Sequence, residues 1–460
     1  MNSLWEMSAA NGAPGAAFHA RDVQVRLSEL GSASILGGKL EALRGRSILL
    51  ATYNQLPTGI ALLELDGVAR RLVLCTPDLS PEQMSAVAAT AEADASLLEE
   101  GAAPTALPIE TFHARATLRT ETLQRQRTHA TEWILLTSGT TGQPKLVVHD
   151  VMSLAGALPR QAARDKPMVW STFYDIRRYG GLQIYLRAVL SGSALVLSSA
   201  GESVREFLTR AAAAGVTHIS GTPSHWRRAL MSGDTGIIQP EYVRLSGEVA
   251  DQTVLDSLKA AYPQARVAHA FASTEAGVAF DVNDGLAGFP ASLVGQPSGS
   301  GSIDMKVQDG TLWIRSGRTA ARYLGNAATL ASEDRYVDTG DMVELEGGRY
   351  HFRGRKGGII NVGGLKVYPE EVESVLNADP RVQMSRVLGR RNPITGAVIV
   401  AEVVLYDRAD TQPGADRDGV KDDLLQACRR VLAAHKVPAM LRFVPSLELT
   451  AAGKLVRPGA

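Results

Sequence analysis

The chain has 460 residues, of which 45% are hydrophobic and 21% are charged. A chain of this length is expected to form two or more domains around a large buried core, and its composition excludes a disordered or low-complexity protein. The 48 basic residues equal the 48 acidic residues in number, so the chain has no bulk field that would attract nucleic acid, and we expect no nucleic-acid partner.

The N-terminal sequence and the cysteines bear on the cellular compartment. The first residues lack the basic start and apolar core of a signal peptide, and no later stretch has about 18 uninterrupted apolar residues. Cys75 and Cys428 are the two cysteines of the sequence, too few for a disulfide framework or a structural zinc site. We therefore predict a cytoplasmic protein without a membrane partner.

Short apolar runs alternate with helix-like stretches in the first 200 residues. The runs are rich in Leu, Val and Ile and are typical of buried strands; they cover residues 46–54, 70–76 and 191–199. The stretch 80–101 is predicted as a helix, because Ser80 can cap its N-terminus and Pro81 suits its first turn. This alternation predicts an α/β architecture with parallel sheet.

The pattern changes near residue 299. Residues 301–317 and 341–355 alternate around Asp-Gly and Gly-Gly pairs, which predicts antiparallel hairpins. A strand at 397–406 and a helix at 420–437 follow. The predicted fold is therefore a large multi-sheet domain with parallel α/β subdomains and an antiparallel β portion, and then a small mobile α+β domain. The predicted domains are 1–354 and 355–460, with a hinge at Lys356 and Gly357.

The segment TSGTTGQPK, residues 137–145, follows an apolar run. Its backbone N–H groups and small hydroxyls suit phosphate oxygens, and Lys145 would add a point charge. Gln143 and Pro144 separate Gly142 from Lys145, so the spacing is not that of the P-loop of kinases and ATPases. A flexible surface turn is the alternative interpretation.

Five segments in order resemble those of the acyl-adenylate-forming superfamily, which contains acyl-CoA and aryl-CoA synthetases, adenylation domains of peptide synthetases, and luciferases. The resemblance runs from about residue 45 to the end of the chain. The segments are TSGTTGQPKL (137–146), AHAFASTEAG (268–277), VDTGDMVEL (337–345), FRGRKGGIINVGGLKVYPEEVE (352–373) and AAHKVPAMLRFVPSLELTAAGKLVR (433–457).

The resemblance implies an AMP-forming acid–thiol ligase. It would activate a carboxylic acid with ATP and Mg²⁺ through an acyl-AMP, release pyrophosphate, and transfer the acyl group to coenzyme A. The implied catalytic residues are Lys454, Glu275, which reaches the metal, and Lys145. The implied ATP-binding residues include these lysines and Thr137, Ser138, Gly139, Thr140, Thr141, Gly142, Gly247, Phe271, Ala272, Ser273, Thr274, Asp341 and Arg355.

Individual roles also follow from the resemblance. Phe271 would stack beside the adenine, Thr274 would lie near the phosphates, and Asp341 and Arg355 would meet the ribose. The small domain would then rotate and present a second face for the thiol step, which the resemblance assigns to Gly363, Gly364 and Lys366. Taken singly, each residue has a plainer interpretation: a capping carboxylate, a turn residue or a solvated lysine.

The segment STFYDIRRYGG, residues 171–181, departs from the superfamily, many of whose members have an aromatic-His pair here. An arginine in this place could hold a second polar or anionic group of the acid; alternatively, Arg177 and Arg178 simply face solvent. The implied acid-pocket residues are Tyr174, Arg178, Tyr179 and Gly181. The phosphate loop arrives early in the chain, which favours a small or aromatic acid over a long fatty acid.

Three other functions remain open at this point. A free-standing adenylating enzyme would load a carrier protein instead of coenzyme A. A catalytically silent relative would bind nucleotide alone, although the retained Lys145, Glu275, Asp341, Arg355 and Lys454 oppose that interpretation. An enzyme of the third kind would activate an unusual oxyanion in place of a carboxylate.

Overall fold

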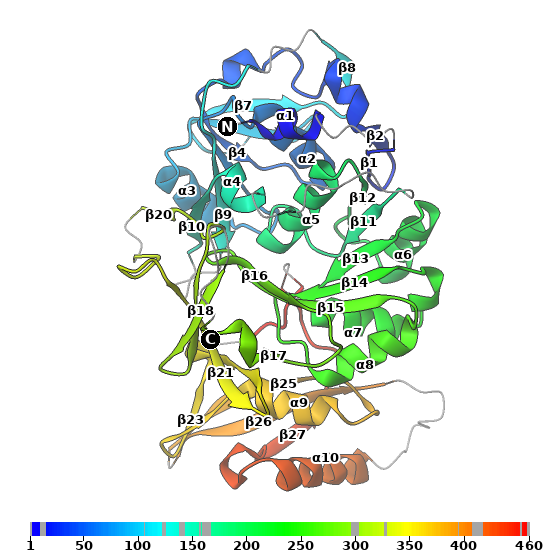
Figure 1. Ribbon diagram of the computed structural model, residues 1–460, viewed down its shortest axis with the longest axis vertical. Coiled ribbons are helices and arrows are strands. Elements are labelled where there is room, and N and C mark those ends of the chain that lie inside the picture. Colours follow the sequence, from blue (N-terminus) through cyan, green and yellow to red (C-terminus); the bar gives the residue numbers. More distant parts are fainter. Residues whose placement is uncertain are drawn as a thin grey trace.

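The computed structural model presents the chain in three tiers (Figure 1), with the blue and cyan N-terminal part above, a green sheet in the middle and the orange and red part below. The structure describes residues 2–9, 15–104, 106–121, 126–137, 143–155, 158, 167–295, 303–325, 329–393, 395–406, 417–450 and 453–457.

The upper tier contains a seven-stranded sheet in the order β20-β10-β9-β5-β4-β6-β7. Its strands from β7 to β9 run parallel, whereas β10 and β20 are added antiparallel. The strands are β4 (Ser47–Leu50), β5 (Arg71–Leu74), β6 (Ala95–Glu99), β7 (Glu110–Ala114), β9 (Glu132–Thr137), β10 (Lys145–His149) and β20 (Arg322–Leu324). The predicted parallel α/β architecture is therefore confirmed in this tier.

The middle tier is an eight-stranded sheet in the order β16-β15-β14-β13-β11-β12-β1-β2, parallel from β15 to β1. Its strands are β1 (Ala17–His19), β2 (Gln24–Arg26), β11 (Val169–Thr172), β12 (Ala194–Val196), β13 (His218–Gly221), β14 (Tyr242–Ser246), β15 (Arg266–Ser273) and β16 (Gly277–Val282). A small pair, β3 (Ala33–Ser34) with β8 (Arg119–Thr120), lies outside both sheets.

Helices join and cover these two sheets. Helix α2 (Gln55–Leu65) is buried along almost its whole length, and it shares one hydrophobic core with α5 (Tyr179–Leu190) and strands of both sheets. The Tyr185 hydroxyl donates a 2.6 Å hydrogen bond to the Gly59 carbonyl, which ties α5 to α2. Along the green sheet lie α6 (Val204–Ala213), α7 (Pro223–Ser232) and α8 (Gln252–Ala261) (Figure 1). The remaining helices of this part are α1 (Leu4–Ala9), α3 (Pro81–Thr90) and α4 (Val151–Ala155).

The lower tier begins with an antiparallel five-stranded sheet, β17-β22-β21-β19-β18. The predicted hairpins are confirmed as β18–β19 and β21–β22. A three-stranded sheet β25-β26-β27 then packs with α9 and α10 around a hydrophobic core of its own. The elements are β17 (Phe289–Pro290), β18 (Asp304–Gln308), β19 (Thr311–Arg315), β21 (Val337–Glu346), β22 (Arg349–Arg355), β23 (Ile360–Val362), β24 (Leu365–Val367), α9 (Pro369–Asn377), β25 (Val382–Asn392), β26 (Gly396–Leu405), α10 (Arg417–Val431) and β27 (Met440–Phe443).

Two predicted helices are wrong at their C-terminal ends. The cap at Ser80 is present and forms a capping box with Gln83, but α3 ends at Thr90 and residues 95–99 form the buried strand β6. Residues 95–99 pair with strands on both sides, so tertiary contacts override the local preference of an alanine-rich stretch for helix. Likewise α10 ends at Val431 instead of continuing to residue 437.

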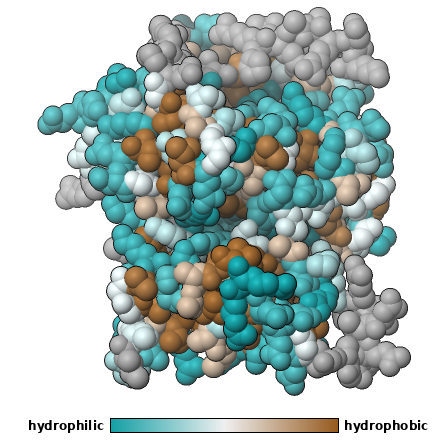
Figure 2. Space-filling model, turned by 60° about the horizontal axis from the view of Figure 1, so that its bottom comes forward, coloured by the Kyte–Doolittle hydropathy of each residue, from teal (hydrophilic) through white to brown (hydrophobic). Residues whose placement is uncertain are grey.

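On the face in Figure 2, hydrophobic residues form separate groups among hydrophilic ones. The most exposed large hydrophobic side chains of the described residues include Val431 at 71% and Tyr53 at 60%, which lie on different elements. Within the residues that the structure describes, no helix is long and apolar enough to cross a membrane.

The core that places α5 gives a first prediction. Leu186 is fully buried in α5, whereas Leu286 is 49% exposed. Leu186→Ala is expected to lower the free energy of unfolding by about 2–5 kcal/mol, because it removes buried methyl groups and leaves a cavity. Leu286→Ala is the matched control and should change it by less than about 0.5 kcal/mol. Urea unfolding followed by circular dichroism measures both, and equal effects would refute the assignment of Leu186 to the core.

Candidate active site

The predicted site residues gather where β14 and β15 end and where the antiparallel sheet begins. Gly247 directly follows β14, and Phe271, Ala272 and Ser273 form the end of β15. Parallel strands of an open sheet place their ligand sites beyond their carboxyl ends. Residues 138–142 of the predicted phosphate loop lie outside the described residues. Their flanks, Thr137 and Lys145, are paired opposite each other on β9 and β10.

Asp341 and Arg355 face each other across the β21–β22 hairpin. The Arg355 Nε donates to the Asp341 Oδ1 at 3.1 Å, and the other carboxylate oxygen, Oδ2, is buried without a hydrogen-bond partner among the residues that the structure describes. Burial raises the pKa of Asp341, while the Arg355 guanidinium opposes that rise. A buried acceptor without a donor is costly in a folded protein. The pair therefore suits a ligand that carries hydroxyl groups, such as a ribose.

Phe271 packs within the hydrophobic cluster of the antiparallel sheet. Its ring stacks on Phe352 of β22 with centroids 5.2 Å apart and planes at 9°, and on Phe280 of β16 at 5.8 Å. The side chain is half-buried. These contacts fix the ring beside β22 and tie the end of β15 to the strand that carries Arg355.

Glu275 and Lys145 meet through a residue that the sequence analysis missed. The Tyr323 hydroxyl of β20 lies 3.4 Å from the Glu275 Oε1, and the Lys145 Nζ lies 5.4 Å from the centre of the Tyr323 ring. Burial and then the Glu275 carboxylate raise the pKa of Tyr323 to about 12, so its hydroxyl stays protonated near neutrality. Tyr323 thus joins a cation and a carboxylate from two different sheets.

Thr274 is held through its carbonyl by His149 of β10, a second residue that the sequence analysis missed. The His149 Nε2 lies 2.7 Å from the Thr274 carbonyl oxygen, and the other ring nitrogen contacts the Ser153 hydroxyl. Burial lowers the pKa of His149 to about 4, so the ring is neutral at pH 7. A neutral imidazole that donates to the Thr274 carbonyl fixes the turn that carries Glu275.

Lys454 reaches this site from the C-terminal end of the chain. The red segment runs back from the lower tier toward β14 and β15 (Figure 1). The Thr222 hydroxyl donates to the Gly453 carbonyl at 2.7 Å, and the Leu455 N–H donates to the Glu248 Oε1 at 3.2 Å. Gly453 has a φ of +70°, and a Cβ there would collide with the His225 ring. The Lys454 Nζ consequently lies next to Gly247.

The surroundings of Lys454 perturb its ammonium group. The side chain keeps accessible surface, but the protein around it displaces much of its water, and this desolvation lowers the pKa of Lys454. The Arg355 guanidinium lowers it further, whereas the Glu248 and Asp341 carboxylates act in the opposite direction. Lys454 and Arg355 together bring positive charge to the place where an anionic ligand would sit.

The lower tier holds the other end of the same segment. The Arg457 guanidinium donates to both carboxylate oxygens of Glu373 on α9 at 2.8 and 2.7 Å. The Arg386 NH1 of β25 donates to the Val456 carbonyl at 2.8 Å. Residues 453–457 are therefore held by the middle tier at one end and by the lower tier at the other.

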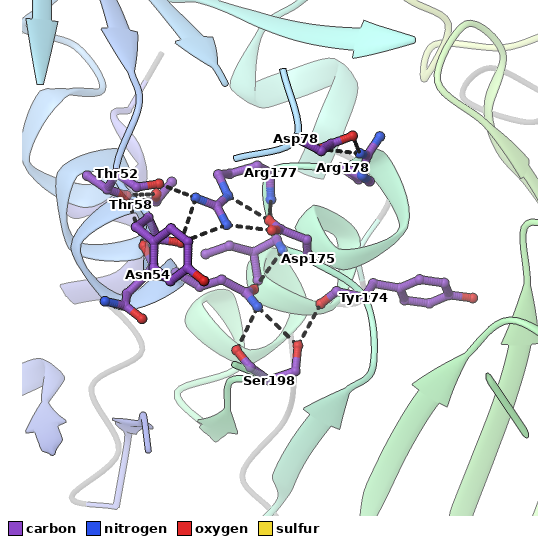
Figure 3. A network of polar contacts seen from close by, with 12 residues as sticks. Thr52, Asn54, Thr58, Asp78, Tyr174, Asp175, Arg177, Arg178 and Ser198 are labelled. Carbon is purple, nitrogen blue, oxygen red and sulfur yellow. Dashed lines mark hydrogen bonds and ion pairs between the residues drawn. The ribbon is translucent and has the colours of Figure 1, made fainter. Parts of the chain in front are cut away.

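The predicted acid-pocket segment contains two arginines, Arg177 and Arg178, which have different hydrogen-bond partners (Figure 3). The buried Arg177 guanidinium binds the Asp175 carboxylate, with an NH2–Oδ2 distance of 2.5 Å, and the carbonyls of Thr52 and Tyr53. The interpretation that it faces solvent is wrong, because backbone carbonyls distant in sequence supply acceptors for it. Arg178 points elsewhere and pairs with Asp78 at 2.8 Å, while its Nε is buried and has no partner in the described part of the chain.

The other acid-pocket residues lie around the start of α5. The Tyr174 hydroxyl donates to the Ser246 carbonyl at 2.7 Å, directly before Gly247. The Tyr179 ring is buried and lies 5.8 Å from the His149 ring. A Cβ on Gly181 would collide with the Asp175 carbonyl, so Gly181 permits the close turn into the helix. Tyr174 and Tyr179 therefore approach the ends of β14 and β15 from the helix side.

The predicted hinge and thiol-step residues lie away from the buried part of the site. Lys356 and Gly357 form an exposed single turn after β22, and a Cβ on Gly357 would meet nothing within 4 Å. Gly363, Gly364 and Lys366 are exposed on the β23–β24 hairpin.

A cavity of about 770 Å³ lies beside this site. Its lining includes Glu132, His149, Arg315 and Tyr323, and contains none of the predicted catalytic residues Lys145, Glu275 and Lys454. Tyr323 and His149 thus separate it from Glu275 and Thr274. We locate the active site by the converging side chains at the ends of β14 and β15 and not by cavity size.

Comparison with known proteins agrees with this arrangement. The family model described as AMP-binding enzyme matches residues 18–324, and that described as AMP-binding enzyme C-terminal domain matches residues 371–454. A match to most of the chain defines the class as that of the adenylating enzymes. The chain belongs to the AMP-binding enzyme family, and the resemblance to the acyl-adenylate-forming superfamily is confirmed.

Individual proteins are similar to this chain at lower identity. A probable CoA ligase of Humulus lupulus is 28% identical over 70% of this chain, and a 2-succinylbenzoate–CoA ligase of Listeria innocua is also 28% identical over 70%. The matched parts cover 64% and 68% of those relatives. The crystal structure of an anthranilate CoA ligase in complex with anthranoyl-AMP has a TM-score of 0.79 and 18% identity, and covers 99% of this chain and 95% of its own. It confirms the predicted mixed α/β fold.

The contacts of residues 453–457 give a second prediction. Thr222→Val removes the hydroxyl that binds the Gly453 carbonyl, and one such bond contributes about 0.5–1.5 kcal/mol. Amide hydrogen exchange in peptides covering 453–457 should therefore become about 2–12 times faster.

Thr222→Ser, which keeps the hydroxyl, is the control for this experiment. Thr222 also caps α7, so Thr222→Val should lose about 1 kcal/mol of unfolding free energy as well. Peptides from α10, which lie far from Thr222 in the lower tier, report that global effect. Exchange at 453–457 that rises no more than in α10 would contradict the proposed contact.

Proposed function

We propose that this protein is an acid–thiol ligase that activates a carboxylic acid as its acyl-AMP and then transfers the acyl group to coenzyme A. The observation that carries the proposal is the position of Lys454, which is held beside Gly247 together with the Asp341–Arg355 pair. Membership of the AMP-binding enzyme family and similarity to two CoA ligases support it.

The proposed first step joins a carboxylate oxygen to the α-phosphorus of ATP and breaks the bond to pyrophosphate. Two anions must approach each other, so the step depends on positioning and charge neutralisation. The Lys454 ammonium is the group proposed to lie between the carboxylate and the α-phosphate. Lys145, on the other side of Tyr323, is proposed to neutralise the leaving phosphates.

The nucleotide and its metal have distinct proposed ligands. The orphaned Asp341 Oδ2 fits the ribose hydroxyls, which would supply the donors that it lacks. Among the described residues, no group of three His, Cys, Asp or Glu side chains could hold a metal by itself. Mg²⁺ is commonly bound by one or two carboxylates together with substrate phosphates, so the single carboxylate of Glu275 fits it. The bound metal would supply positive charge to the phosphates.

The second step would require residues 453–457 to leave the site. We propose that the part beginning at residue 355 rotates about Lys356 and Gly357, which the open surroundings of Gly357 support. The hairpin with Gly363, Gly364 and Lys366 would then face the thiol. A carrier-protein thiol is the alternative acceptor, and a small or aromatic acid is the proposed substrate. Two similar proteins are named for such acids, 2-succinylbenzoate and anthranilate.

The direct test is acid-dependent release of pyrophosphate from ATP and Mg²⁺, with aryl, short-chain, medium-chain and dicarboxylic acids, each with and without coenzyme A. Release that one acid class stimulates, with a thioester formed after coenzyme A is added, is the expected result. Release without a thioester would favour a carrier protein as acceptor. Binding of ATP without release for any acid would refute the proposal and favour a nucleotide-binding relative.

The two half-reactions give a third prediction. Lys454→Ala should lower the rate of acyl-AMP formation by a factor of about 100 or more, because it removes the positive charge between two anions. Binding of ATP should remain. Lys366→Ala should instead slow thioester formation from preformed acyl-AMP and spare adenylation. Quenched-flow assays of each half-reaction measure both variants. If both variants lose the same half-reaction, the proposed rotation between the two half-reactions is contradicted.

The pKa of Lys454 gives a fourth prediction. This pKa is lowered, so Lys454 should lose its proton at a pH below the ordinary lysine value of about 10.4, and kcat/KM for ATP should fall as the pH rises through it. Arg355→Gln removes a positive charge that lowers this pKa, so it should move the alkaline limb to higher pH. Lys454→Arg serves as the control and should lack the limb. If Arg355→Gln does not shift the pH of the alkaline limb, the assignment of this limb to Lys454 is contradicted.

A further inference from the structure

One face of α5 runs from Tyr179, a predicted acid-pocket residue, toward Arg187. Tyr179, Gln183 and Arg187 are spaced by four residues and therefore lie on the same side of the helix. Together with Val278 of β16 and Arg318 they line a small cavity of about 20 Å³. This face is a second polar region, separate from the Arg177 network at the start of the helix.

Two residues that line the cavity, Arg187 and Arg318, each have a guanidinium nitrogen whose hydrogen-bonding capacity is not used. Within the described residues, the Nε atoms of Arg187 and Arg318 are both buried and have no hydrogen-bond partner. Arg318 is held in place by its NH1, which donates to the Val278 carbonyl at 2.9 Å. The nearby Gln183 donates from its Nε2 to the Leu154 carbonyl at 2.9 Å, and its amide oxygen does not accept from either Nε atom.

The charges around the cavity do not balance. Arg244 donates from two of its nitrogens to a single oxygen of Asp281, Oδ1, at 3.0 and 2.8 Å. Arg187 and Arg318 also feel the Asp281 charge, and they repel each other. Three guanidinium groups thus share one carboxylate among the described residues. Because arginine does not give up its proton in a protein, this excess charge calls for an anion.

The cavity adjoins the proposed reaction centre. Val278 is paired with Ala272 at the end of β15, and the Tyr179 ring approaches His149, which contacts the Thr274 carbonyl. Arg187 follows Tyr179 by eight residues, which corresponds to about 12 Å along the helix axis. An acid whose reacting carboxylate lies near Lys454 could therefore extend along α5 toward Arg187.

We propose that Arg187 and Arg318 bind a second anionic group of the acid substrate, which makes the enzyme selective for dicarboxylic acids or for acids with an equivalent distal anion. This inference rests on the proposed function and narrows it to one substrate class. The cavity has room for about one water-sized atom. One oxygen of the distal group, or a single bridging water, would therefore fill the cavity and accept hydrogen bonds from the two Nε atoms.

A comparison of Arg177 with Arg187 supports the assignment of a ligand-binding role to Arg187. Arg177 has its acceptors within the protein, from Asp175 and two backbone carbonyls, and is therefore structural. Arg187 lies ten residues later, on α5, and burial also removes water from its guanidinium, but its Nε has no hydrogen-bond partner in the described part of the chain. Charge-assisted hydrogen bonds from such a group are strong, so a ligand that completes them gains selectivity.

The test compares each acid with its counterpart that carries a second carboxylate. Suitable pairs are linear monocarboxylic and α,ω-dicarboxylic acids of about eight to twelve carbons, whose extended lengths bracket the ~12 Å rise from Tyr179 to Arg187. A third series with a terminal primary amide separates charge from size. For the wild-type enzyme, kcat/KM in acid-dependent pyrophosphate release should be at least about tenfold higher for the best diacid than for its monoacid and its amide.

Arg187→Gln and Arg318→Gln should each bring this ratio close to one, mainly by raising KM for the diacid. Arg205→Gln is the matched control, because Arg205 is exposed and pairs with Asp234 outside the cavity; its ratio should stay at the wild-type value. If Arg187→Gln does not fold, Arg187→Lys and Arg318→Gln give the same readout.

A wild-type ratio near one, with release supported by a monoacid, would overturn the anion site and leave the proposed function standing. A high ratio that both glutamine variants retain would also overturn it. If none of the acids supports pyrophosphate release, the proposed function is overturned, and this inference with it.

Discussion

The position of Lys454 depends on a short segment that two parts of the molecule hold at once. The middle tier contributes the Thr222 hydroxyl and the Glu248 carboxylate, and the lower tier contributes Arg386 and Glu373. Each bond to the middle tier is worth about 0.5–3 kcal/mol net. A few such bonds fix a side chain well, yet they can be broken at modest cost, which is what the proposed departure of Lys454 between the two half-reactions would require.

The charges of the site are arranged for a ligand that brings negative charge and hydroxyl groups. Lys454 and Arg355 repel each other, and this repulsion is one reason that the pKa of Lys454 is lowered. Asp341 compensates in part, but no described residue donates to its Oδ2. A nucleotide would relieve both conditions, because its phosphates favour the protonated lysine and its ribose hydroxyls supply donors. Binding and charge state are therefore coupled at the same few side chains.

The sequence was sufficient for those features that depend on neighbouring residues. The β21–β22 hairpin follows from local alternation and a Gly-Gly turn, and it brings Asp341 opposite Arg355 without further information. The helix predicted over 80–101 failed because its second half is a strand, whose partners come from segments distant in sequence. Tyr323 was missed for the same reason, since it lies in an unremarkable strand and becomes significant only where β20 joins β10.

The arginines of the 177–187 segment show the limit of sequence interpretation most directly. The residue type gives the charge of Arg177 and Arg187 but not the supply of acceptors around each. For Arg177 the acceptors are carbonyls that the loop after β4 places there, more than a hundred residues away in the chain. For Arg187 no such acceptor is present at Nε in the described residues; instead the charges of Arg244 and Arg318 lower its pKa, and Asp281 opposes them. The tertiary arrangement therefore decides which guanidinium is structural and which is available to a ligand.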